Sequence, residues 1–126
     1  MYQYYNANPD RKQVGDCVIR ALSKALDQDW EKTFVEVAFE GFLLCDMPSA
    51  NHVWASYLRH KGLSRYTIPD DCPDCYSVAD FCRDHPKGTY VLSLDGHVVA
   101  VQDGCFFDTW DCSDRAVLYY WKRKEE

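Results

Sequence analysis

Two Asp-Gly dipeptides constrain the fold of this chain more than any other feature of its sequence. They occupy positions 95–96 and 103–104, between runs rich in β-branched, leucine and aromatic residues. Asp-Gly is favoured in two-residue hairpin turns, because a type I′ turn requires a positive φ at both central residues. The dipeptides therefore predict a three-stranded antiparallel meander. Its strands are expected at Thr89 to Leu94, His97 to Gln102 and Cys105 to Trp110.

The first half of the chain has a helical pattern instead. Apolar residues recur three and four positions apart in three segments that are bounded by capping or glycine signals. Helices are expected from Cys17 to about Leu26, from Trp30 after a capping Asp29, and from near Ser49 to a stop at Gly62. The inner stripe of the second helix is expected to contain Trp30, Phe34, Val37, Ala38 and Phe42.

The remaining elements are short. Ser77 followed by Asp80 resembles a capping box, which opens a helix that ends before Pro86. Residues 66–68 and 117–121 have the composition of strands, and residues 1–12 are expected to form an extended arm and a turn. Because helices precede an antiparallel sheet, the sequence predicts an α+β fold. The 126 residues contain no linker and are expected to form a single domain, residues 1–126.

Composition argues against several classes of partner. The net charge is −6 at pH 7 and the basic residues are scattered apart from positions 122–124, whereas nucleic-acid binding requires a clustered basic face. No apolar run approaches the roughly 18 residues of a membrane span, so a membrane partner is not expected. The seven cysteines cannot all pair within one chain. Without a signal-peptide pattern, they favour reduced thiols and a cytoplasmic location.

One cysteine is placed where it can ionise. Gly15 and Asp16, a residue expected to cap the helix, precede Cys17, which falls in the first turn. The N-terminal end of a helix presents unpaired N–H groups and a partial positive charge, and both stabilise a thiolate. Cys17 is therefore a candidate nucleophile, with its own backbone N–H as one donor to an oxyanion.

The hairpin register supplies partners for this thiol. If positions 103–104 form a two-residue turn, Gln102 faces Cys105, and His97 and Asp108 become diagonal neighbours on one face. Such diagonals lie about 7–8 Å apart at the backbone, within reach of an imidazole and a carboxylate. The other residues of that face are apolar, and we expect the Cys17 helix to pack on them. They are Leu92, Leu94, Val99, Val101, Phe106 and Trp110.

These three residues predict an activated thiol. His97 would accept the thiol proton as general base and return it as general acid, and Asp108 would fix the imidazole tautomer. The order of Cys17, His97 and Asp108, with the cysteine opening a buried helix and the histidine opening a strand in Gly96-His97-Val98-Val99-Ala100-Val101, resembles the papain-like cysteine peptidase fold. Within it, the chain is most similar to the small bacterial group that includes double-glycine leader peptidases.

The resemblance covers residues 12–110 and implies a helical N-terminal lobe, a sheet and a cleft between them. It implies hydrolysis or transfer at an amide or thioester, a peptide or protein as substrate, and no cofactor. The family usually has a glutamine about six residues before its cysteine as oxyanion donor. Arg11 stands there, and Gln13 is the expected donor, with Asn6 or Asn8 in reserve. The family also often has Gly or Trp directly after its cysteine, where this chain has Val18.

Two other interpretations stay open. The first is a papain-like module that binds a peptide or protein in the same cleft without hydrolysing it. The second is a zinc-stabilised interaction domain, because a C-x2-C-x6-C-x2-H pattern could supply tetrahedral ligands. Its members are Cys72, Cys75, Cys82 and His85. The short middle spacing and the core-facing position of the last two favour reduced structural thiols over zinc.

Overall fold

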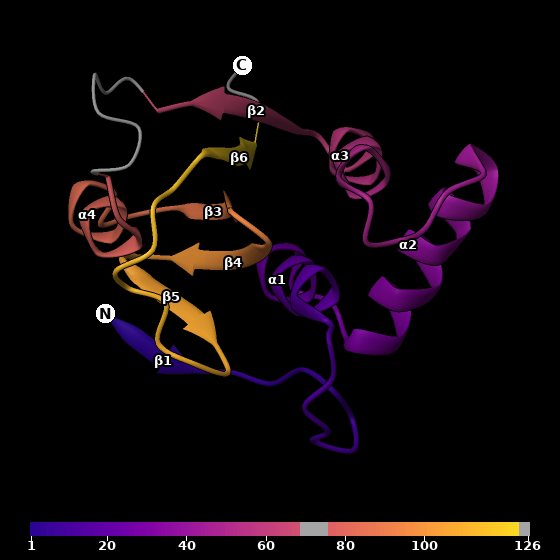
Figure 1. Ribbon diagram of the computed structural model, residues 1–126, viewed down its shortest axis with the longest axis horizontal. Helices are drawn as coiled ribbons and strands as arrows, with labels where there is room; N and C mark the ends of the chain where they lie inside the picture. The colour runs from indigo at the N-terminus through magenta and orange to yellow at the C-terminus, as the bar shows by residue number, and fades with distance from the viewer. Residues whose placement is uncertain (69–75, 124–126) are drawn as a thin grey trace.

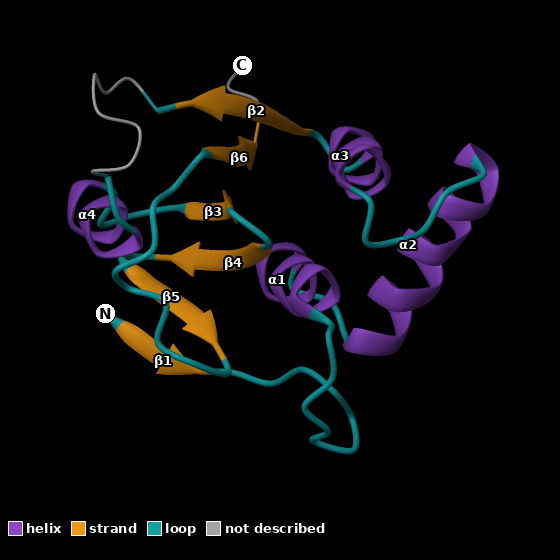
Figure 2. Ribbon diagram, in the orientation of Figure 1, coloured by secondary structure: helices purple, strands orange, loops and turns teal. Residues whose placement is uncertain are grey.

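The computed structural model describes residues 1–68 and 76–123. The helices in this part of the chain are α1 (Cys17–Leu26), α2 (Trp30–Leu44), α3 (Asn51–His60) and α4 (Val78–Asp84). The strands are β1 (Tyr2–Tyr4), β2 (Leu63–Thr67), β3 (Thr89–Leu94), β4 (His97–Gln102), β5 (Cys105–Asp108) and β6 (Tyr119–Arg123). They form one sheet in the order β1-β5-β4-β3-β6-β2. The predicted α+β class is confirmed, and Figures 1 and 2 show the strands between α4 on one side and α1, α2 and α3 on the other.

The meander forms at the predicted positions. The strands β3 and β4 have the expected bounds, and Gln102 pairs with Cys105 across the second turn. Asp103 and Gly104 both have positive φ, as a type I′ turn requires. The strand β5 ends at Asp108 rather than at Trp110, and the next backbone N–H, that of Thr109, donates to the Asp108 carboxylate instead of to a neighbouring strand.

The sheet is larger than the sequence indicated and is not wholly antiparallel. The N-terminal arm contributes β1, which pairs in parallel with β5 so that Tyr4 lies opposite Asp108. The strand β2 covers Leu63–Thr67, pairs antiparallel with β6 and completes the other edge. The C-terminal strand begins at Tyr119, two residues later than predicted. The expectation of an antiparallel sheet is therefore wrong for β1. Parallel pairing needs a long connection between the two strands, and about a hundred residues separate β1 from β5.

The helix α1 packs on the sheet face opposite to the predicted one. Its buried residues, such as Leu22, form a core cluster with Val98 and Ala100 of β4. The face expected to receive α1 instead belongs to a second cluster, in which Leu92 and Val99 lie with Phe81 of α4. Both faces of β3 and β4 are apolar, so alternation alone does not say which helix covers which face.

The helix α2 also differs from expectation. Val37 is buried as predicted, but Phe34 and Phe42 have 44% and 75% of their surface exposed. Polar residues face inward instead, because α3 offers them partners: Ser56 donates to the Glu40 carboxylate across 2.5 Å. Despite its apolar outer face, neither α2 nor any other helix in the described residues is long and apolar enough to cross a membrane.

Candidate active site

Cys17 is the first residue of α1, and the backbone there leaves donors free. The first hydrogen bond of the helix runs from the Arg20 N–H to the Asp16 carbonyl at 2.8 Å. The N–H groups of Cys17, Val18 and Ile19 thus have no partner inside the helix. Asp16 occupies the N-cap position, but its side chain does not cap as predicted. The donors at the helix start are therefore available to a thiolate or an oxyanion.

His97 and Asp108 meet as the hairpin register predicts. Nε2 of His97 lies 2.5 Å from Oδ2 of Asp108. The carboxylate is fully buried, whereas the imidazole keeps 12% of its surface exposed. The Thr109 N–H donates to the other carboxylate oxygen at 2.7 Å. Asp108 therefore fixes the orientation of the ring and leaves Nδ1 free to face another group.

Cys17 and His97 each shift the pKa of the other side chain. Burial alone would raise the pKa of the thiol, but hydrogen bonds from His97 and from the backbone of Val98, together with the charge of His97, bring the pKa below its usual value. Burial alone would lower the pKa of His97, but hydrogen bonds with Asp108, Cys112 and Cys17 raise it to about 11. Both directions favour a thiolate paired with an imidazolium over a neutral pair.

A buried arginine joins the start of α1 to this pair, and the sequence analysis missed it. Arg20 lies one turn after Cys17 and binds Asp16 at 2.7 Å and Asp108 at 2.9 Å. Asp16 also accepts from Nε1 of Trp30 at 2.9 Å, which explains why its side chain does not cap the helix. Burial alone would raise the pKa of Asp108, but His97 and Arg20 keep it below its usual range. The signal in the sequence was an acid and a base four residues apart on a buried helix.

Cys112 is a second thiol in the site, and no sequence pattern marked it. Its sulfur lies 3.5 Å from Oδ2 of Asp108 and is fully buried, and burial raises its pKa. The ligand atoms of His97, Asp108 and Cys112 all lie within 4.8 Å of one another, so these residues could together hold a metal ion. Arg20 opposes a cation there, because its guanidinium binds the same carboxylate.

Gln13 lies on the exposed loop before α1 and makes no hydrogen bond to Cys17 or His97 in the described structure, so its role as oxyanion donor stays a prediction. The two reserve residues shape this loop. The Asn6 side-chain amide donates to the backbone carbonyl of Lys12 at 3.1 Å, and Oδ1 of Asn8 accepts from the N–H of Asp10 at 2.9 Å. The loop is thereby folded against itself, with the Gln13 side chain outside.

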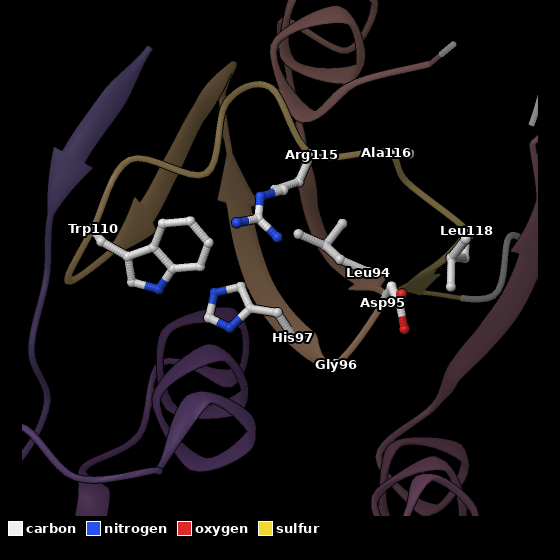
Figure 3. A pocket seen from close by; sticks show the side chains of 8 residues that line it. All are labelled: Leu94, Asp95, Gly96, His97, Trp110, Arg115, Ala116 and Leu118. Atoms are coloured by element: carbon white, nitrogen blue, oxygen red, sulfur yellow. The ribbon is translucent and has the colours of Figure 1, made fainter. Parts of the chain in front are cut away.

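Two pockets flank the Cys17–His97 pair and share no lining residue. The pocket beside Cys17 has a volume of about 380 Å³ and a largely apolar wall, in which Trp30 and Phe34 stack with ring centroids 5.0 Å apart. The pocket beside His97 has a volume of about 460 Å³, and Trp110 and Arg115 contribute to its wall, as Figure 3 shows. One hollow therefore lies beside Cys17 and a separate one lies beside His97.

Half of the predicted zinc pattern, Cys72 and Cys75, lies outside the described residues. Cys82 is buried in α4, where burial raises its pKa. The His85 ring lies against Phe81 with centroids 3.8 Å apart, and its Nδ1 is 2.9 Å from the Phe81 carbonyl. These two residues are placed as packing partners of the second core cluster.

Similarity to known proteins is a further source of information on function. Comparison with protein-family models, with curated proteins and with solved structures finds no match, so the function of this site is inferred from its own geometry.

Proposed function

We propose that the protein is a thiol-dependent hydrolase of the papain-like kind, which cleaves peptide or isopeptide bonds. Cys17 is the nucleophile, His97 the general base and then acid, and Asp108 the group that orients His97. The observation that carries the proposal is the hydrogen bond between the His97 imidazole and a fully buried carboxylate, beside a Cys17 thiol whose pKa His97 lowers. A nucleophile, a base and an orienting group in this order make an activated thiol.

The reaction follows from the arrangement. The Cys17 thiolate attacks the carbonyl carbon, and the carbonyl oxygen becomes an oxyanion that the free N–H groups at the start of α1 can stabilise. The imidazolium of His97 then gives its proton to the leaving nitrogen, the carbon–nitrogen bond breaks, and an acyl thioester remains on Cys17. His97 next removes a proton from water, whose oxygen attacks the thioester and regenerates the thiolate.

Alkylation tests the nucleophile. Near pH 7 an ordinary cysteine is only a few per cent thiolate, so an ionised Cys17 is expected to react with iodoacetamide roughly tenfold or more faster than the other six cysteines. His97→Ala is expected to abolish this preference. His85→Ala is the matched control, because it removes another half-buried histidine and should leave the preference intact. Equal labelling of all seven cysteines would overturn the proposal.

Cleavage of a peptide library, followed by mass spectrometry, tests the reaction itself. The wild-type protein is expected to cleave, and Cys17→Ala is expected to be inactive. The exposed position of Gln13 favours one second candidate, a papain-like module that binds peptides without cleaving them. Fast labelling of Cys17 combined with binding of peptides that stay intact would identify that module.

A further inference from the structure

The two pockets beside the reacting groups have different positions in the proposed reaction. His97 must reach the leaving nitrogen to protonate it, so the part of the substrate that departs lies over His97. The pocket that His97 lines is therefore the leaving-group side, and the apolar pocket that Cys17 lines is the acyl side. This assignment rests on the proposed function.

Arg115 dominates the chemistry of the leaving-group pocket. Figure 3 shows its guanidinium pointing toward the space between Trp110 and His97. The guanidinium lies 5.3 Å from the centre of the Trp110 ring, and the centroids of Trp110 and His97 are 4.8 Å apart. A cation held over an indole is restricted in its movement, so Arg115 is partly preorganised beside the reacting imidazole.

The charge of Arg115 is largely available to a ligand. Its only ion pair in the described residues joins Nε to Asp114 at 4.0 Å, the outer limit for such a contact. Asp95 also lines the pocket, but Figure 3 shows its carboxylate on the other side, directed away from the guanidinium. Leu94 and Leu118 form apolar parts of the wall. A guanidinium presents a planar set of donors that matches a carboxylate in two-point contact.

We infer that the leaving-group pocket binds a carboxylate, so the preferred substrates carry an acidic group directly after the cleaved bond. An acidic side chain and a free C-terminal carboxylate supply the same chemistry. The imidazolium of His97 adds a second positive charge at the pocket wall before the proton is transferred. Arg115 acts on specificity rather than on the chemical step, since it is not part of the thiol–imidazole–carboxylate chain.

Matched peptides test the inference. The peptides are drawn from sequences that the wild-type protein cleaves, and the residue after the cleaved bond is Glu, Gln or Lys. Each peptide is prepared in a long form and in a form that ends at that residue, either amidated or as the free acid. We expect kcat/KM to be about fivefold to tenfold higher for Glu than for Gln, as for one charge-assisted contact that is partly exposed. The terminal carboxylate is identified as the group that the pocket binds if kcat/KM is higher for the free acid than for the amide only in the short Gln peptide.

Variants separate Arg115 from other cations. Arg115→Gln is expected to make the Glu and Gln peptides equivalent, and Arg115→Glu to shift the preference to Lys. Arg65→Gln is the matched control, because Arg65 also stacks on an aromatic ring, Tyr119, at 5.1 Å but does not line the pocket. Its preference should equal that of the wild type.

The outcomes are distinct. Cleavage of Glu, Gln and Lys peptides at equal rates with no advantage of a free acid over its amide, or an unchanged preference in Arg115→Glu, overturns the inference while the hydrolase stands. Failure to cleave any peptide, together with equal labelling of the cysteines, overturns the proposed function and the inference with it. If Cys17 labels quickly but no peptide is cleaved, the comparison uses iodoacetate and iodoacetamide. Arg115→Gln must then lower the rate of the iodoacetate reaction at Cys17 relative to that of the iodoacetamide reaction. An unchanged ratio of these two rates overturns the inference.

Discussion

Replacement of Arg20 by methionine tests whether the buried charges hold the site together. Methionine keeps a long unbranched side chain and a high helix propensity but removes the guanidinium. Two charge-assisted hydrogen bonds are lost, at 2.7 Å to Asp16 and 2.9 Å to Asp108, and both carboxylates remain buried. Removing one partner from a buried ionic network typically costs about 3–5 kcal/mol. Two hydrogen bonds to charged groups, at about 1.5–3 kcal/mol each, give a similar sum.

Urea denaturation measures this loss. With a slope of about 1–3 kcal/mol per molar urea, the midpoint of unfolding is expected to fall by roughly 2 M in Arg20→Met at pH 7. The matched control is Arg83→Met, because Arg83 also binds two carboxylates but has 70% of its side chain exposed. Water screens the ion pairs of Arg83, so the midpoint of that variant should change little.

The pH dependence distinguishes charge from packing. The pKa of Asp108 is lowered in the folded protein, so its ionised form stabilises the fold above the unfolded pKa, and this stabilisation is lost as the pH falls through the folded pKa. In Arg20→Met, Asp108 loses one of the charges that lower its pKa. Protonation of Asp108 in acid then removes the buried charge that destabilises the variant. The difference in unfolding free energy between wild type and variant should thus shrink between pH 7 and about pH 4. An equal loss at both pH values would refute the electrostatic account, since it would show that only the packing of the side chain was lost.

Three further predictions concern the thiol and the helical lobe. The rate of iodoacetamide labelling of Cys17 should reach half its maximum below pH 9.0, because the thiol pKa lies below that value. His97→Ala should move this half-maximum to higher pH. A profile centred at or above pH 9 contradicts the pairing of a Cys17 thiolate with His97. Gly41→Ala should destabilise the protein by about 1–3 kcal/mol in urea denaturation, because a Cβ would lie 2.6 Å from the backbone oxygen of Asp46; unchanged stability would contradict this close approach. Phe42→Ser should leave the urea midpoint nearly unchanged, because this side chain is 75% exposed, whereas a large loss would place it in the core.

The parts of the fold that were predicted correctly from the sequence depend on short local patterns of residues. The turn at 103–104 and the capping box of Ser77 and Asp80 each depend on a few adjacent residues, and both form as expected. The contact between His97 and Asp108 was predictable because a two-residue turn fixes the register of both strands. Short-range chemistry therefore determined both the hairpin and half of the site.

The parts that were missed depend on contacts between distant segments. The pairing of β1 with β5 has no local signal, and neither has the choice of sheet face for α1. Phe34 appeared to be a core residue because it lies on an apolar stripe, but α3 binds the polar stripe of α2 instead. Arg20 appeared to be an ordinary helix residue, because its second partner, Asp108, lies 88 residues further along the chain.

The pairing of β1 with β5 sets the order in which the site can be completed during synthesis. A ribosome makes β1 and the Cys17 helix first, but Tyr2 pairs with Phe106 and Tyr4 with Asp108, which emerge about a hundred residues later. Contacts over such a separation form slowly, because a long loop must close before they contribute energy. Cys17 is thus made long before His97 and Asp108, and the influence of His97 that lowers the pKa of its thiol can arise only after β4 has been made.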